Sequence, residues 1–422
     1  MAAMDSAAVI GTEIERVTPL VEDMYEIDDT FYGTIDKDAN IEVVSERDMR
    51  IPLKLRPGGY FGHFGINGQD MGRGSGTTYD KAVINTVNLR YACEWTKAAE
   101  WGTDSTRKSV VNVFQKLVAD AMPQFRSDSD KLCMQPGTGV LGTVSAVSTA
   151  SGVDTVTLNS DGFGAMLLRF GLKVNVYDAT LATNRTAAGE PQITYYDPAN
   201  KVIKLTPAVT GIVATDVIVI SGLSGANPVS LLGVPYHNSN ASTGTWLGLA
   251  RADNPEIRST GVNAAGALQL PQARLAVNKM MNRIGMGPTK KLKLKAWMNP
   301  AQAAAYEQLG QLVTVINQMP NGGKLNLYYG DDMQLAGGIP VKTSIHWDMT
   351  RIDFLVDNFW GRAEMHKPGF YEVGGQKFWP VRGASGGLAT AQLFYITASW
   401  NLFCKNPAAA AYIYGLTKPT GY

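Results

Sequence analysis

A glycine-rich stretch between two alternating segments limits what this chain can fold into more than any other feature of its sequence. Residues 57–78 contain eight glycines, and Ile51, Leu53 and Leu55 alternate with other residues just before them. After the stretch, apolar residues from Val83 to Trp95 share one face of an extended chain. A period of two is typical of strands, so the pattern predicts one long hairpin.

Such a hairpin needs a surface to rest on. A loop of this length without secondary structure of its own is unusual in a compact domain, and an isolated two-stranded hairpin is only marginally stable in water. We therefore expect the extended β-hairpin loop, residues 41–95, to lie on another surface. A neighbouring copy of the same chain is the natural candidate.

The charge balance limits the partners of the chain. It has 38 basic and 37 acidic residues, whereas a protein that grips nucleic acid by neutralising phosphates is strongly basic. Any DNA nearby is therefore expected to be enclosed rather than gripped. Cys93, Cys133 and Cys404 form no CxxC pair, which argues against a disulfide scaffold and against structural zinc.

Neither a secretion signal nor a membrane span is expected. Residues 1–8 have no cationic stretch that leads into an apolar run. No apolar stretch approaches the roughly 18–20 residues that a helix needs to cross a bilayer. The 422 residues, 45% of them apolar, suffice for a sizeable core and two or three domains. The sequence indicates a soluble chain made in a reducing cytoplasm.

The next segments of the chain differ in periodicity. Residues 10–29 are acidic, with a helix-like spacing that Pro19 interrupts, and are expected to form an arm that docks elsewhere. Apolar residues over 110–125 predict a long amphipathic helix, which Pro123 kinks or divides. Over 141–222, short β-rich runs separated by Gly, Asp, Asn and Pro predict a small inserted all-β barrel or sandwich.

The last third alternates helices with strands, which predicts an α+β domain. A helical stripe over 273–284 stops at Gly285. Asn299 followed by Pro300 predicts a helix start, because a capping side chain precedes a residue whose φ is already fixed. Lysines alternate with leucines over 291–295, which predicts a strand with one exposed face. Further strands are expected at 339–343, 352–356 and 388–403.

No catalytic, cofactor-binding or metal site is expected. Residues 383–387 match GxSxG, but a strand-like run follows where a hydrolase needs a helix, and no histidine comes later. Residues 36–40 open like a calcium loop but lack its glycine and its twelfth-position ligand. Residues 72–76 lack the lysine of a phosphate-binding loop. Four histidines have no second ligand at metal-binding spacing, namely His63, His237, His346 and His366.

Two more features have an ordinary interpretation beside a functional one. The lysine run 290–295 is interpreted first as the exposed face of a strand and second as a DNA contact. The eight tryptophans are spread along the chain, so core or interface packing is preferred to a sugar-binding site.

Taken in order, these segments resemble the major capsid protein of tailed bacteriophages, whose fold is shared with encapsulin shells and the floor of herpesvirus capsids. The order is an acidic arm, a glycine-tipped hairpin, a long helix and an α+β body, and the resemblance covers nearly the whole chain. The stretches similar to the family are Gly162–Gly164 with Leu168–Val174, Leu232–Tyr236, Gly244–Leu249 with Arg251, Asn254–Pro255, Trp297–Gln302 with Tyr306–Leu309, and Ser399–Leu402 with Asn406–Pro407.

The resemblance implies an α+β fold with six parts. They are an N-terminal arm (1–40), the extended β-hairpin loop (41–95), a peripheral domain with the spine helix (96–140), an inserted β-barrel-like domain (141–230), an axial domain that begins with a connecting segment 231–260 (231–385), and the C-terminal strand and tail of the peripheral domain (386–422).

The resemblance also implies a function without catalysis or cofactors. The chain would self-assemble into pentamers and hexamers that form an icosahedral head shell around double-stranded DNA, in the virion and, during assembly, in the host cytoplasm. Its partners would be itself, a portal protein, scaffolding and decoration or cement proteins, and DNA without sequence specificity; no membrane is implied. Expected inter-subunit contacts are Tyr60, Phe61, Phe64, Ile66 and Arg73. The tip, 57–78, has no lysine, so an isopeptide cross-link from it is not expected.

Two alternatives stay open on the sequence. An encapsulin-like nanocompartment would also be a shell, but would hold enzyme cargo instead of DNA. A hydrolase or carbohydrate-binding enzyme with a β module would need carboxylates or exposed aromatics gathered in one pocket.

Overall fold

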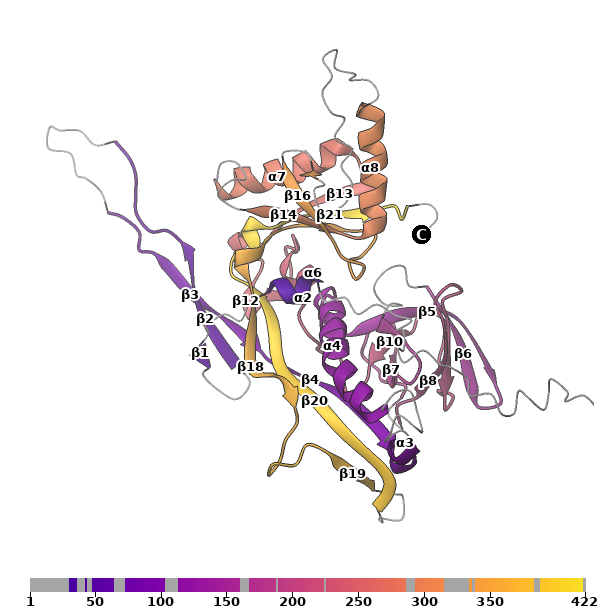
Figure 1. Ribbon diagram of the computed structural model, residues 1–422. Coiled ribbons are helices and arrows are strands. Elements are labelled where there is room, and N and C mark those ends of the chain that lie inside the picture. The colour runs from indigo at the N-terminus through magenta and orange to yellow at the C-terminus, as the bar shows by residue number, and fades with distance from the viewer. Residues whose placement is uncertain are drawn as a thin grey trace, which may run out of the picture. The chain divides into compact units, whose positions relative to one another are not determined.

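The hairpin is present in the computed structural model. Strand β2 (Asp48–Arg56) pairs antiparallel with β3 (Thr78–Asn85), and the short β1 (Glu42–Val43) pairs with the other side of β2. Figure 1 shows β2 and β3 side by side as a ribbon. The structure describes residues 30–35, 42–43, 48–63, 73–102, 113–159, 167–186, 189–223, 225–285, 293–314, 334–335, 338–382 and 388–419.

The segment after the glycines, which was expected to be one strand, forms two strands. β3 ends at Asn85, and β4 (Val87–Thr96) begins after Thr86. β3 pairs with β2, whereas β4 pairs with β20 (Leu388–Cys404), about three hundred residues further along the chain. Alternating apolar residues show that a segment is extended, but they do not identify its partner, and the partner changes at Thr86.

The apolar face at the base of the hairpin is buried in the chain's own body. Met49, Ala82 and Ile84 pack with Trp246 and Leu249, which belong to the short antiparallel pair β11 (Thr245–Trp246) and β12 (Leu249–Ala250). Farther along β2, Ile51, Leu53 and Leu55 are only partly buried against this cluster. The base therefore needs no second copy to cover it.

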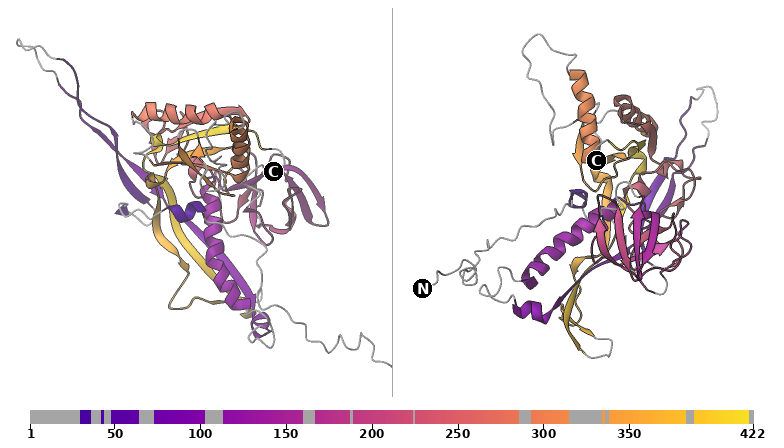
Figure 2. Two further views of the ribbon diagram at one scale, coloured as in Figure 1. Left: turned by 45° about the horizontal axis from the view of Figure 1, so that its top comes forward. Right: turned by 90° about the vertical axis from the view of Figure 1, so that its right-hand side faces the viewer.

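The predicted long helix is confirmed as α4 (Val113–Cys133), which contains Pro123. Figure 2 shows it as one continuous ribbon. Its side chains Ala121 and Phe125 are buried, in agreement with the apolar stripe.

The β-rich segment forms a six-stranded antiparallel sheet whose order is β7-β10-β5-β6-β9-β8. The segment that leads into the edge strand β7 also pairs with the other edge strand, β8: Gly171 N–H donates to the Ile193 carbonyl (2.8 Å), Ile193 N–H donates to the Leu172 carbonyl (2.9 Å), and Lys173 bridges to Gln192. The sheet therefore closes on itself, as in a small barrel. Its strands are β5 (Val140–Ala150), β6 (Val153–Leu158), β7 (Val174–Tyr177), β8 (Gln192–Asp197), β9 (Val202–Thr206) and β10 (Val217–Ile220).

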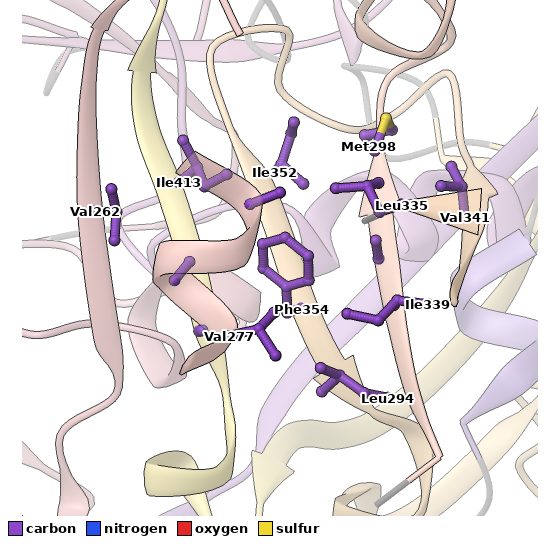
Figure 3. Packing of buried hydrophobic residues seen from close by; sticks show 14 of the residues in the cluster. Val262, Val277, Leu294, Met298, Leu335, Ile339, Val341, Ile352, Phe354 and Ile413 are labelled. Carbon is purple, nitrogen blue, oxygen red and sulfur yellow. The ribbon is translucent and has the colours of Figure 1, made fainter. Parts of the chain in front are cut away.

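The last third forms a mixed six-stranded sheet of order β13-β21-β17-β14-β16-β15. One face packs on α7, and Phe354 lies among the buried side chains of this cluster (Figure 3). The elements are β13 (Thr260–Gly266), α7 (Leu270–Ile284), β14 (Leu294–Met298), α8 (Pro300–Thr314), β15 (Gln334–Leu335), β16 (Ile339–Thr343), β17 (Ile352–Val356) and β21 (Ala411–Leu416).

The predicted start of one helix and the predicted end of another are confirmed in this region, whereas the lysine-rich strand differs from the prediction. Asn299 Oδ1 accepts the Ala301 N–H (3.0 Å) and caps α8, and α7 ends at Gly285 with a left-handed φ of 64°. The lysine-rich strand starts only at Leu294. Lys295 forms an ion pair with Asp357. The other four residues of β14, Leu294, Ala296, Trp297 and Met298, are buried. Since β14 is central in its sheet, it is covered on both sides instead of having one exposed face.

The opposite face of this sheet holds a cluster of aromatic side chains around the short helix α2 (Thr30–Thr34). Phe31 meets Trp297, Trp347 and Trp360 edge to face, with ring centroids 5.3, 5.5 and 6.2 Å away. Tyr32 meets Trp400 at 5.5 Å. These four tryptophans therefore serve packing, as predicted, and they fix the first described helix.

The described residues fall into two units. The first comprises the described residues within 90–125 and 368–398, and it has an aromatic core: Trp95 lies 5.7 Å from Phe378 and 6.0 Å from Phe394. The second comprises 28–89, 126–367 and 399–422. Strands β18 (Trp360–Phe370) and β19 (Trp379–Arg382) flank β20 in a sheet that also includes β4. The remaining helices are α3 (Lys97–Gly102), α6 (Val234–His237), η1 (Pro255–Ile257), η3 (Asp357–Phe359) and η4 (Pro407–Ala409).

Candidate functional site

The tip of the hairpin exposes large apolar side chains. Tyr60 is 71% exposed and Phe61 is fully exposed, and Arg73, which lies before the returning strand β3, is exposed as well. An exposed aromatic pair on a two-stranded ribbon is a feature of interaction surfaces rather than of a finished monomer surface. Two other predicted contact residues, Phe64 and Ile66, lie outside the described residues.

Close approach of the two chain segments explains one of the glycines. A Cβ on Gly58 would lie 2.5 Å from the Thr77 nitrogen and 2.7 Å from the Ser75 carbonyl oxygen. Gly59 N–H donates to that same carbonyl (2.8 Å). The ribbon thus continues past the end of β2 toward the tip, and only glycine fits at position 58.

The outer face of the ribbon is polar and cationic. In the antiparallel register, Lys54 lies opposite Tyr79 and Pro52 lies opposite Lys81. Residues directly opposite each other share one face, and all four are exposed, Tyr79 by 68%. The sequence showed that Lys54 faces away from Leu53 and Leu55, but not which residues of the returning strand join it, since the register depends on the intervening loop.

An ion pair fixes the ribbon near the end of β2. Arg56 Nε donates to Glu256 Oε1 (2.8 Å), and Arg56 Nη2 donates to the Asp253 carbonyl (2.8 Å). The hydrogen bond from Arg56 lowers the pKa of Glu256. Both groups are partly exposed, so this contact orients the ribbon more than it stabilises the fold.

Buried titratable groups have structural roles. His237 Nδ1 accepts the Trp246 indole N–H (3.0 Å), and its Nε2 lies 3.0 Å from the Leu402 carbonyl. His346 Nδ1 lies 2.6 Å from Asp130 Oδ2, with both side chains buried. These contacts agree with the interpretation of the histidines as packing residues.

The other sequence motifs lie partly outside the described residues, and the chain that follows two of them is extended. β20 begins at Leu388, directly after the GxSxG segment, so a strand follows it; residues 383–387 themselves lie outside the described part, as do 36–40 and 10–29. After residues 73–76 the chain continues into β3, not into a helix. Among the described residues, no three His, Cys, Asp or Glu side chains gather as a metal site would require. No described helix is both long enough and apolar enough to traverse a bilayer.

Comparison by sequence identifies no relative, since no family model and no curated protein matches the chain. Comparison by structure finds chains of similar fold. A chain of the cyanophage A-1(L) capsid asymmetric unit is 11% identical, with a TM-score of 0.58 over 98% of this chain and 100% of that one. A chain from the capsid of an empty GTA particle is also 11% identical, with a TM-score of 0.51 over 99% and 100%. The resemblance to tailed-phage capsid proteins is therefore confirmed for the fold: from end to end, this chain has the fold of a phage capsid subunit.

Proposed function

We propose that the chain is a major capsid protein, which assembles with itself into pentamers and hexamers and forms the icosahedral head shell of a tailed bacteriophage around double-stranded DNA. In this role it has no catalytic activity and needs no cofactor. It acts in the virion, after assembly in the host cytoplasm with portal, scaffolding and decoration proteins.

The observation that carries the proposal is the exposed tip of the hairpin in a chain with a capsid fold. Fully exposing Phe61 forgoes apolar burial worth roughly 25 cal/mol per Å², and a contact with another copy recovers it. Because the hairpin of one copy contacts a different surface of the next, the contact is head to tail. Such contacts close into rings when the rotation permits.

Replacing the tip tests the proposal. Arg56 and Thr78 lie opposite each other in register, so an Asn-Gly turn in place of residues 57–77 closes the shortened hairpin as a two-residue turn. The buried base, with Met49 and Ile84, stays intact. We expect a folded, soluble subunit that forms no closed shells, judged by circular dichroism, sedimentation velocity and electron microscopy.

A matched control uses a turn that is already tight. Ser151 and Gly152, both with positive φ, join β5 to β6, and Ser151→Asn creates the same Asn-Gly turn there. This variant should assemble like the wild type. Closed shells from the tip replacement would contradict the role given to the hairpin, and a wild-type chain that sediments only as a monomer would contradict the capsid function.

The encapsulin-like alternative is distinguished by particle contents. Particles purified from infected or producing cells should contain double-stranded DNA that resists nuclease until the shell is opened. Particles that hold a protein cargo and no DNA would favour the nanocompartment instead.

A further inference from the structure

The outer face of the hairpin carries positive charge without acidic partners. We call Arg50, Lys54, Tyr79 and Lys81 the cationic face; all four are exposed. In the described part of the chain, Lys54 and Lys81 have no acidic side chain in contact. The acid next to them in sequence, Asp80, lies opposite Leu53 and therefore belongs to the other face.

Positive charge is less concentrated toward the base of the hairpin than in the part beyond β1. There β1 places Glu42 opposite Arg50 in register. The part of the cationic face beyond β1, with Lys54, Tyr79 and Lys81, is therefore the part that lacks a counter-charge. A surface of this kind fits an acidic segment that also offers apolar side chains to the tyrosine ring.

The sequence contains such a segment. Residues 13–29 have seven acidic residues and one basic residue, Arg16, and five of the acids fall within residues 22–29. Met24, Tyr25 and Ile27 are interspersed with them. In a chain with 38 basic and 37 acidic residues, this is a strong local excess of negative charge.

The segment is joined to a fixed point. α2 follows it directly at Thr30, and Phe31 and Tyr32 are buried among tryptophans of the chain's own body. Tyr32 N–H also donates to the buried Asp130 carboxylate (2.6 Å). Fully extended, the seventeen residues before Thr30 span about 55 Å, so the segment can contact surfaces far from α2.

We propose that the cationic face of one copy binds the acidic segment 13–29 of a second copy. This inference rests on the proposed function, because it requires copies that lie side by side. Lys54 and Lys81 pair with the acids around residues 22–29, and Tyr79 packs on their apolar neighbours. The contact is electrostatic and exposed, so it weakens as salt shortens the Debye length, which is about 10 Å at 0.1 M.

Charge exchange tests the pairing. The double variant Lys54→Glu/Lys81→Glu should raise the subunit concentration needed for shell assembly by about tenfold, since two attractions become repulsions. Adding Glu22→Lys and Glu26→Lys to the same chain should restore assembly to within about threefold of the wild type. The control Arg274→Glu/Lys279→Glu makes the same charge change at exposed positions of α7 and should not be rescued by the changes at 22 and 26.

Disulfide cross-linking tests whether the contact joins two copies. In Glu26→Cys/Lys54→Cys, the native cysteines add little background because Cys93, Cys133 and Cys404 are buried. Oxidation should give a ladder of covalent multimers on a non-reducing gel. A monomer band alone, with or without an internal cross-link, would overturn the proposal.

The two proposals fail in different ways. If the wild type forms shells but the charge exchange restores nothing, only the pairing of these surfaces is wrong. If the wild type forms no shells under any condition, the capsid function is wrong, and the absence of multimers in the cross-linking experiment would then remove the pairing as well.

Discussion

At the scale of single residues, Asp353 is a carboxylate shared by three side chains. It is 1% exposed and accepts hydrogen bonds from Asn238 Nδ2 (2.6 Å), Trp347 Nε1 (3.0 Å) and both Nε and Nη2 of Arg351. The Arg351 guanidinium also lies 4.1 Å from the Tyr412 ring centroid. The largely buried Arg351 cation therefore has this carboxylate as its ion-pair partner.

Asp353→Asn should lower the free energy of unfolding by about 3–5 kcal/mol, because it leaves the Arg351 charge without its counter-ion. Urea titration of the unassembled subunit measures this. Asp357→Asn, which removes the partly exposed ion pair with Lys295, is the control and should cost about 0–1 kcal/mol. Equal losses for the two variants would contradict the role given to Asp353.

His237 makes stability depend on pH. Burial lowers its pKa to about 3, and the neutral ring is the form that fits, because an indole N–H can only donate and Trp246 donates to Nδ1. The unfolded chain has an ordinary histidine pKa of about 6.5. The unfolded state therefore binds the proton first, and stability is complete above about pH 6.5 and is lost as the pH falls toward 3.

The expected loss from this group is about 2 kcal/mol between pH 7 and pH 5. It is measured as the difference in unfolding free energy of wild type and His237→Gln at the two pH values, since the glutamine variant lacks this contribution. A parallel profile for wild type and His237→Gln would refute the assignment.

Residue roles could be predicted from the sequence where the determinants are close in the chain. Asn299 caps α8 through Ala301, two residues away, and sequence pattern suffices for such a contact. Asp353 was not predicted, since its partner Asn238 is more than one hundred residues distant. Tyr79 and Lys81 were not recognised as part of a site either, because their alignment with Lys54 depends on strand register.

At the scale of elements, α2 shows how a five-residue helix is held in place. A helix this short is not stable alone, so its order comes from Phe31 and Tyr32 against four tryptophans. The sequence indicated an N-terminal arm but not this anchor, because Trp297, Trp347, Trp360 and Trp400 are distributed over a hundred residues and meet only in the fold.

Phe31→Ala should lower the free energy of unfolding by about 3–5 kcal/mol, the usual cost of removing a buried aromatic side chain. Limited proteolysis should then cleave near residue 30 at a higher rate than in the wild type. Phe31→Leu retains most of the buried volume and should lose clearly less. If Phe31→Ala unfolds like the wild type, α2 is not anchored through this ring.

Elements with strong periodicity were predicted well, and pairing was not. The helix α4, the inserted β unit and strands β16, β17 and β20 were expected close to where they lie. The partner of β4 was not, because the residues that complete its sheet are in β20. Closure of the inserted sheet into a barrel also depends on a contact between segments that are distant in the chain. Gly171, just before β7, bonds to Ile193 in β8.

At the scale of the whole molecule, near-neutral charge predicts weak binding to DNA. Non-specific binding comes from phosphate neutralisation, with Kd of about 10⁻⁴ to 10⁻⁶ M for DNA-binding proteins at physiological salt. With 38 basic and 37 acidic residues, the unassembled subunit should not retard a DNA duplex at low micromolar concentration in about 150 mM salt. Salt-sensitive retardation that Lys290→Glu/Lys291→Glu abolishes would instead assign DNA contact to that lysine run.

The inserted barrel leaves the body and returns to it through one paired stem. Ile220 N–H donates to the Gly139 carbonyl (3.0 Å), and Ser230 N–H donates to the Gly137 carbonyl (2.8 Å), so the two strands of the stem are held together. Whatever is attached between them begins and ends at nearly the same place. A single recombination event can therefore exchange or remove this module while the flanking ends remain joined.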